Sequence, residues 1–148
     1  VMVTQKGQSI RFSVESIRTS QRTSGGVKGI KLFDDDKVVG MGIATPGSYV
    51  LVVSTQGYGK LTQIDRYPKQ HRAGSGVRTI KLVDKTGELA DARIVSPSQQ
   101  VMFISANGIV TRTPVKEISI LDRSTQGVRL MRMDEGDSVV AVAHMETA

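Results

Sequence analysis

The sequence has no cysteine and no tryptophan, and only 4% of its 148 residues are aromatic. The absence of cysteine excludes disulfide scaffolds, thiolate zinc sites and cysteine nucleophiles, and it allows a reducing compartment such as the cytoplasm. The scarcity of aromatic rings argues against a single-strand nucleic-acid binder, because such proteins stack bases on aromatic side chains. Apolar runs such as residues 50–53 have four or five residues, whereas a membrane helix needs about 20, so no membrane span is expected.

Side chains that perform catalysis or bind metals are also sparse. His71 and His144 lie far apart, and neither has a second ligand at metal-binding spacing. The acidic run at residues 34–36 lacks the glycine and glutamate of a calcium-binding EF-hand loop, so we expect a solvated acidic turn. The glycine-rich stretches 57–60 and 74–76 match neither phosphate-loop pattern, and no serine sits in a nucleophile elbow. We therefore expect no catalytic residue, no metal ligand and no cofactor in this segment.

The chain does contain a repeat of about fifty residues. Two glycine anchors recur three times each, at separations of 50 and 51 residues, and they are in phase. The anchors are Gly7, Gly57 and Gly108, and Gly26, Gly76 and Gly127. A period of this length is typical of propeller blades, so we predict one repeat domain over residues 1–148, with repeats at about 1–46, 47–96 and 97–148.

Within each repeat, apolar residues alternate with a period of two, which predicts strands. Continuous apolar runs at 50–53 and 101–104 indicate buried strands, and the glycine turns that follow them indicate hairpins. We also predict strands at residues 30–32 and their copies, and a closing strand at 38–43, 88–95 and 139–143. Only the loop at about 15–25, with its copies, has room for a short helical turn. The prediction is an all-β fold with about three four-stranded blades.

Positive charge is unevenly distributed along the chain. The 20 Lys and Arg residues exceed the 14 Asp and Glu residues, and the three repeats have net charges of +3, +4 and −1. Residues 66–81 contain five cations and no acid. Such a sign-asymmetric surface steers polyanions, so we expect the middle repeat to dominate the binding of a polyanion.

Many of the cations occupy corresponding positions in the repeats. The three rows are Arg22, Arg72 and Arg123; Lys28, Arg78 and Arg129; and Lys31, Lys81 and Arg132. Two further cations, Lys60 and Arg112, follow the hairpin turns of the second and third repeats, and Arg11 is the residue of the first repeat nearest to their position. Rows of cations around an axis can neutralise successive DNA phosphates without reading bases. The alternative is that Lys and Arg serve solubility and edge protection. We predict duplex DNA contacts by Arg22, Lys28, Lys31, Lys60, Arg66, Lys69, Arg72, Arg78, Lys81, Arg112, Arg123 and Arg129.

Several motifs resemble a known family. The segments Thr-Pro-Val (113–115), Glu-Ile-Ser (117–119), Arg-Ser-Thr-Gln-Gly-Val-Arg-Leu (123–130), Asp-Glu-Gly-Asp (134–137) and Val-Val-Ala-Val-Ala (139–143) resemble the final blade of the C-terminal domain of bacterial DNA gyrase A subunits. The segments Gly-Gly-Val-Lys-Gly-Ile-Lys-Leu (25–32) and Asp-Lys-Val-Val-Gly-Met (36–41) resemble an upstream blade. The resemblance implies a β-pinwheel, a propeller-like disc whose blades exchange strands and whose basic rim bends duplex DNA.

Two departures from the family pattern stand out. The family wheel typically has six blades, so this chain would be a partial wheel from the C-terminal part of a larger subunit. The basic box of the gyrase family, Gln-Arg-Arg-Gly-Gly-Lys-Gly, is absent, and residues 21–29 are only a loosened relative of it. The start at Val1 leads us to expect a piece of a longer protein. We expect no secretion signal within these residues, because no cationic leader precedes an apolar run.

The resemblance implies an accessory domain that wraps DNA and supports supercoiling by a type IIA topoisomerase. The segment itself would be non-catalytic, with ATP and magnesium needed only by the parent enzyme. The implied partners are double-stranded DNA, the gyrase B subunit, and the remaining blades and core of the gyrase A protein, in the bacterial cytoplasm at the nucleoid. Two copies of the fragment would complete a six-bladed ring. The alternatives are the corresponding domain of topoisomerase IV, a protein-interaction propeller, whose Trp-Asp signature is missing, and a small β enzyme.

Overall fold

The computed structural model describes residues 1–18, 22–23 and 25–146, and most of its regular structure is β-strand. Each repeat starts with an antiparallel hairpin whose turn contains a glycine with φ between 86° and 89°. Because L side chains rarely adopt such a φ, glycine recurs at Gly7, Gly57 and Gly108. The hairpin strands are β1 (Met2–Thr4) and β2 (Gln8–Ile10), β4 (Tyr49–Ser54) and β5 (Tyr58–Gln63), and β8 (Gln99–Ser105) and β9 (Val110–Pro114).

A short 3₁₀ turn follows each hairpin. These turns are η1 (Val14–Ser16), η2 (Ile64–Arg66) and η3 (Val115–Glu117), at the start of the loops that the sequence leaves long enough for one helical turn. No helix in the described residues is long and apolar enough to cross a membrane. The all-β fold class is confirmed.

A closing strand completes each repeat by pairing with the first strand of its hairpin. These strands are β3 (Val38–Met41), β7 (Leu89–Val95) and β11 (Val139–Glu146). They pack against one another, with β7 between β3 and β11. A side chain at Gly40 would place its Cβ 2.4 Å from the carbonyl oxygen of Ala92, so the contact between β3 and β7 requires glycine there.

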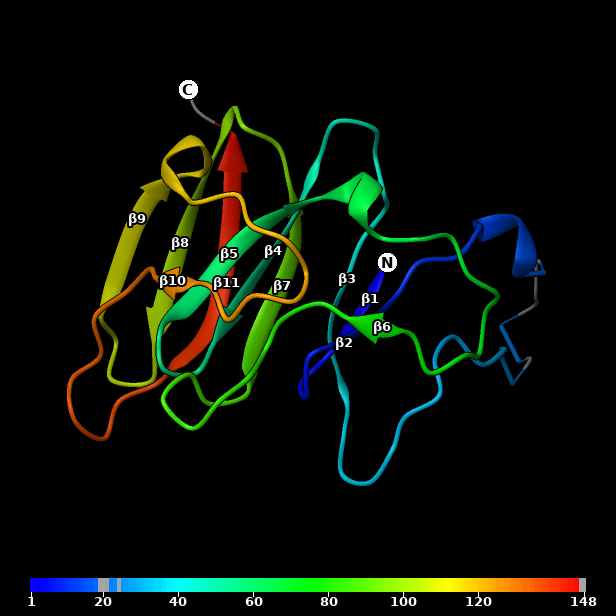
Figure 1. Ribbon diagram of the computed structural model, residues 1–148, viewed down its shortest axis with the longest axis horizontal. Coiled ribbons are helices and arrows are strands. Elements are labelled where there is room, and N and C mark those ends of the chain that lie inside the picture. Colours follow the sequence, from blue (N-terminus) through cyan, green and yellow to red (C-terminus); the bar gives the residue numbers. More distant parts are fainter. Residues whose placement is uncertain (19–21, 24, 147–148) are drawn as a thin grey trace.

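Two short strands cross from one repeat into the sheet of the preceding repeat. β6 (Val77–Arg78) pairs with β2, and β10 (Val128–Arg129) pairs with β5. The sheet orders are therefore β3-β1-β2-β6, β10-β5-β4-β7 and β11-β8-β9, arranged side by side in Figure 1. The exchange of strands between blades, which the resemblance implied, is confirmed.

The strands predicted at residues 30–32 and their copies are wrong. Strand pairing in the second and third repeats covers residues 77–78 and 128–129, just before the predicted positions. Ile30, Ile80 and Met131 are nevertheless 6%, 2% and 3% exposed. These side chains are buried although their backbone does not pair in a β-sheet. The alternation of apolar residues therefore predicts which side chains are buried, but not where the strand lies.

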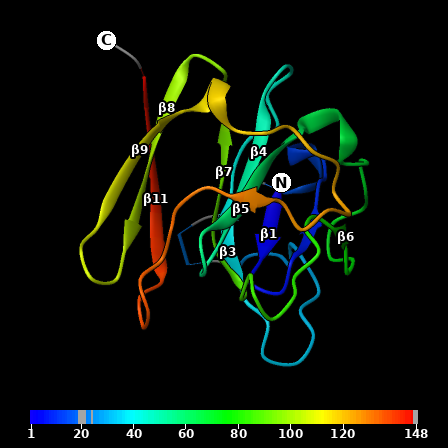
Figure 2. The same ribbon diagram turned by 60° about the vertical axis from the view of Figure 1, so that its left-hand side comes forward.

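The middle sheet is buried on both faces. Val50 and Val52 of β4 pack with Val3 and Ile80 in one core, between the first and second sheets. Leu51 and Val53 point the other way and pack with Phe103 and other residues of the third repeat in a second core. This explains the unbroken apolar run of β4, because successive side chains of a strand face opposite sides. Figure 2, turned by 60°, shows the first and third sheets on either side of this middle sheet.

Candidate nucleic-acid interface

Nine of the twelve predicted DNA-contacting side chains are exposed. They are Arg22, Lys28, Lys31, Arg66, Lys69, Arg78, Lys81, Arg112 and Arg129. Four of them come from the acid-free stretch at residues 66–81, and they lie on η2, on β6 and in the adjoining loops. The second repeat therefore presents a cluster of cations to solvent, available to an anionic partner.

Lys60 is not part of this surface, and the expectation that it lies with the exposed cations is wrong. Its side chain is fully buried on β5, where Nζ donates hydrogen bonds to the carbonyl oxygens of Asp122 (2.5 Å), Arg123 (3.0 Å) and Thr125 (2.9 Å) and to Thr125 Oγ1 (3.0 Å). Burial lowers its pKa to about 8. The alignment of the repeats indicates that position 60 is buried, because Lys60 corresponds to the buried Ile10.

The row of Arg22, Arg72 and Arg123 also differs from a simple line of surface cations. Arg72 is half-buried, and its Nη1 donates to the carbonyl oxygen of Lys28 at 2.7 Å. Arg123 is half-buried as well, and its Nη1 donates to the carbonyl oxygen of Arg78 at 2.9 Å. Because Lys28 and Arg78 occupy the same repeat position, the two contacts are equivalent. We call them the arginine clasps; each joins one repeat to the preceding one.

The second clasp has a further bond that concentrates charge at the junction of the second and third repeats. Arg123 Nε donates to the carbonyl oxygen of Arg66 at 2.8 Å, so one guanidinium holds the backbone of both Arg66 and Arg78. These residues line a depression of about 440 Å³ with Asp65, Asp122 and Ser124. Arg66 Nε lies 3.7 Å from Asp122 Oδ1, and both side chains are more than half exposed. Exposed ion pairs of this kind are weak, so the pair with Asp122 does not hide the charge of Arg66 from solvent.

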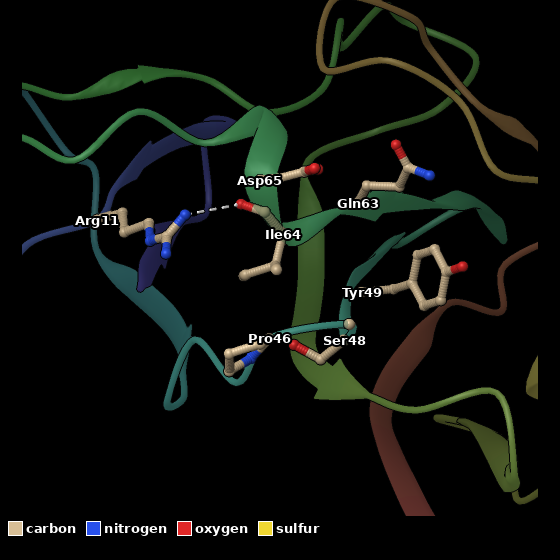
Figure 3. A pocket seen from close by; sticks show the side chains of 8 residues that line it. Arg11, Pro46, Ser48, Tyr49, Gln63, Ile64 and Asp65 are labelled. Carbon is tan, nitrogen blue, oxygen red and sulfur yellow. Dashed lines mark hydrogen bonds between the residues drawn. The ribbon is translucent and has the colours of Figure 1, made fainter.

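Arg11 makes a different contact at the junction of the first and second repeats. Its Nη1 donates to the carbonyl oxygens of Ile64 (3.1 Å) and Tyr67 (3.2 Å), at the edge of a pocket that also includes Tyr49 and Gln63. Figure 3 shows the guanidinium pointing toward the Ile64 carbonyl. Arg11 is therefore a structural residue.

Several exposed cations contact neighbouring side chains. Arg129 Nη2 donates to the hydroxyl oxygen of Tyr58 at 2.8 Å, and its guanidinium lies 5.3 Å from the centroid of that ring. Lys85 Nζ lies 5.7 Å from the same ring. Arg112 Nη2 lies 3.0 Å from Met145 Sδ. These contacts are exposed, so they fix side-chain directions without hiding the charges from solvent.

The acidic turns have structural roles. Asp36 Oδ1 accepts hydrogen bonds from the backbone N–H groups of Lys6 and Lys37. Asp137, at the corresponding position of the third repeat, accepts from the N–H groups of Asn107 and Ser138, and hydrogen bonds led by that of the Ser105 hydroxyl lower its pKa. Among the described residues, no group of three or more His, Cys, Asp and Glu side chains could hold a metal ion.

Comparisons with known proteins place these features in a family context. The sequence model of a family described as "DNA gyrase C-terminal domain, beta-propeller" matches residues 1–45, 48–96 and 99–144. The DNA gyrase A protein of Dehalogenimonas lykanthroporepellens is 52% identical over 151 residues, covering 98% of this chain and 19% of that protein. The gyrase A protein of Mycolicibacterium smegmatis is 39% identical, covering 97% of this chain and 17% of that protein. The chain thus spans less than a fifth of the length of these relatives.

Solved structures show the same architecture. A DNA gyrase A C-terminal domain superposes with a TM-score of 0.84 at 28% identity, covering 95% of this chain and 48% of that one. The C-terminal domain of a DNA topoisomerase IV superposes with a TM-score of 0.89 at 21% identity, covering 98% of this chain and 46% of that one. At that identity, the second likeness shows the fold alone.

Proposed function

The chain belongs to the DNA gyrase C-terminal domain family, and from this membership we propose that it binds duplex DNA without sequence preference and bends it along its basic surface. In this proposal it is an accessory module of a bacterial topoisomerase that supports supercoiling. Its partners are double-stranded DNA, the gyrase B subunit, and the remaining blades and core of the gyrase A protein, in the cytoplasm at the nucleoid. ATP and magnesium serve the parent enzyme.

The observation that carries the proposal is the exposed cation cluster of the second repeat. Arg66, Lys69, Arg78 and Lys81 are all exposed, and no acid occurs between residues 66 and 81. Lysine and arginine side chains that contact phosphates release condensed counterions, which supplies sequence-independent affinity. Arg66 and Arg78 are held by the same guanidinium, so their backbone positions are fixed before DNA binds.

The gyrase assignment is supported over the topoisomerase IV alternative by sequence. Several gyrase A proteins match nearly the whole chain at 37% to 52% identity. The topoisomerase IV structure, at 21% identity, supports the common fold. A module of three repeats still faces the elastic cost of bending DNA, of order 1–6 kcal/mol over 20–30 base pairs, so binding and bending need separate measurements.

The test is a salt titration of binding to a fluorescent duplex, followed by anisotropy. Replacing Arg66, Arg78 and Lys81 together with Ala should lower the slope of log K against log salt by about two to three units, because each lost phosphate contact accounts for about 0.9. The charge-matched control replaces Lys6, Lys37 and Lys116, which are exposed outside the cluster, with Ala. Equal slopes for the two triple variants would contradict the proposal. Energy transfer between dyes at the duplex ends would report bending separately.

A further inference from the structure

The loop at residues 122–125 contacts the backbone of three exposed cations of the second repeat. We call these the loop-held cations; they are Arg66, Arg78 and Lys81. The guanidinium of Arg123 holds the first two through their carbonyl oxygens, at 2.8 Å and 2.9 Å. The carbonyl oxygen of Thr125 accepts a hydrogen bond from the backbone N–H of Lys81 at 2.9 Å. One loop therefore fixes the backbone of three of the four cations that carry the proposed function.

The ammonium of Lys60 holds this loop from the inside of the protein. Its Nζ contacts four oxygens of the loop, three of them backbone carbonyls, at 2.5 Å to 3.0 Å. An ammonium has three N–H donors and no acceptor, so all of its donors are used. Three carbonyl oxygens that converge on one point repel one another unless a cation lies between them, so the ammonium stabilises this conformation of the loop.

The equivalent loop of the second repeat, residues 71–74, covers an apolar side chain instead of a cation. Ile10 occupies the position of Lys60, and its Cδ1 would lie 3.8 Å from a Cβ placed on the glycine of that loop. Arg72 donates one bond there, to the carbonyl oxygen of Lys28, and its buried Nε has no hydrogen-bond partner among the described residues. The clasp above Lys60 uses its Nε as well and makes two bonds. The fuller clasp thus occurs where an ammonium lies beneath the loop.

Lys69 belongs to the same exposed cluster, but a different part of the chain holds it. Its backbone forms a β-bridge with Arg11 of the first repeat, and the N–H of the next residue, Gln70, donates to the Arg11 carbonyl oxygen at 2.7 Å. Neither contact involves residues 122–125. The position of Lys69 therefore does not depend on Lys60, and Lys69 serves as an internal reference for the loop-held cations.

We propose that Lys60 is a positioning residue for DNA binding, which holds the loop-held cations in place for phosphates through residues 122–125. This role rests on the proposed function, because it requires those cations to meet DNA. The Lys60 side chain is fully buried, so it does not itself reach a phosphate. Groups that are ordered before association bind at a lower entropic cost than groups that are ordered by it. Removal of the ammonium therefore weakens DNA binding although no contact with DNA is removed.

The substitution Lys60→Met tests this role, because it removes the ammonium and keeps an unbranched side chain. Ile10 shows that an apolar side chain fits beneath such a loop, and Lys60→Ile repeats the measurement with that residue. Circular dichroism would verify that both variants are folded. In the folded variants, affinity for a duplex at fixed salt should fall about tenfold, and the slope of log K against log salt should fall by at least about 0.9, the share of one phosphate contact.

Lys116→Met is the matched control, because it makes the same substitution at an exposed cation outside the cluster. It should change the affinity and the slope much less than Lys60→Met does. Equal effects of the two substitutions would show that Lys60 contributes only its charge, and would overturn the proposal. Unchanged affinity and slope in the folded Lys60 variants would overturn it as well.

A double-mutant cycle separates positioning from a general loss of stability. Arg78→Ala should cost less affinity in the Lys60→Met background than in wild type, because Arg78 is already displaced there. Lys69→Ala should cost the same in both backgrounds, because the first repeat holds Lys69. If Lys60 served stability alone, the cycle with Arg78 would be additive too, and that result would overturn the proposal.

Amide hydrogen exchange tests the loop without DNA. The N–H of Lys81 bonds to the Thr125 carbonyl oxygen, so its exchange should become about tenfold faster or more in Lys60→Met. The N–H of Thr79, which donates to the Gly7 carbonyl oxygen at 2.8 Å, is the control and should keep its rate. An unchanged rate at Lys81 would overturn the holding of the loop by Lys60.

The salt slopes distinguish a failure of this role from a failure of the proposed function. If the triple variant of the loop-held cations keeps the wild-type slope, the proposed function is overturned, and the role of Lys60 in DNA binding is overturned with it. If the triple variant loses slope and Lys60→Met does not, only the role of Lys60 is overturned.

Discussion

The guanidinium of Arg123 donates a 2.9 Å hydrogen bond to the backbone carbonyl oxygen of Arg78, so a cation of the third repeat holds the chain that carries an exposed cation of the second. The same contact joins Arg72 to Lys28 one repeat earlier. Arg123 and Arg78 are both members of the charged rows in the sequence, but they have different roles. One fastens adjacent repeats, and the other faces solvent.

The first prediction concerns the stability that this clasp supplies. Arg123→Gln should lower the free energy of unfolding by about 1–3 kcal/mol, because hydrogen bonds from a charged group to two backbone carbonyls are lost. Urea denaturation would measure the change. Lys81→Gln, which removes an exposed charge, should stay within about 0.5 kcal/mol of wild type. Similar losses for the two variants would show that Arg123 has no clasping role.

The second prediction separates clasped from exposed cations in DNA binding and depends on the proposed function. Lys69→Gln and Arg72→Gln remove the same charge three residues apart, but only Lys69 is fully available to a phosphate. Lys69→Gln should lower the salt slope of binding by about 0.9, and Arg72→Gln should leave it unchanged. Anisotropy titrations on folded variants would measure both slopes. The reverse order would contradict this interpretation of the row.

The third prediction follows from the buried ammonium of Lys60. Burial lowers its pKa from 10.5 to about 8, so between these values the unfolded chain binds more protons than the folded chain. The contribution of Lys60 to the free energy of unfolding should therefore increase as pH rises from about 8 to 10.5. The quantity to measure is the stability difference between wild type and Lys60→Met across this range. A difference that is flat with pH would show that Lys60 titrates normally.

The fourth prediction concerns the contact between β3 and β7. Gly40→Ala should destabilise the protein by about 1–3 kcal/mol, since its Cβ would meet the Ala92 carbonyl oxygen and force a backbone shift. Gly25→Ala is the matched control, because a Cβ there has no neighbour within 4 Å. Thermal or urea unfolding would compare the two. Equal stability would indicate that β3 can move away from β7 without cost.

Much of the fold could be predicted from the sequence because the same turns and the same pattern of buried residues recur in each repeat. Glycine anchors such as Gly57 fix turns that need positive φ, and alternation reports which side chains are buried. The local sequence pattern does not locate the exchanged strands, since residues 77–78 and 128–129 pair with strands of another repeat. Two residues are too few to show a period.

The candidate site could be predicted in charge but not in geometry. Residue type shows that Arg72, Arg123 and Lys60 are cations, and it says nothing about nearby backbone carbonyls. The acceptors of Arg72 and Arg123 are main-chain oxygens, and so are three of the four acceptors of Lys60; every residue has such an oxygen. Only the alignment of the repeats indicates that Lys60 is buried, because it places Lys60 at the position of the buried Ile10.

The alternating side chains of β4 have a consequence for how the molecule comes apart. Val50 and Val52 belong to one core and Leu51 and Val53 to the other, so a single strand is the common wall of both. Neither core can melt and leave the other with an intact boundary. Heating should therefore give one cooperative transition, with equal van't Hoff and calorimetric enthalpies, instead of the stepwise loss of blades expected of loosely coupled repeats.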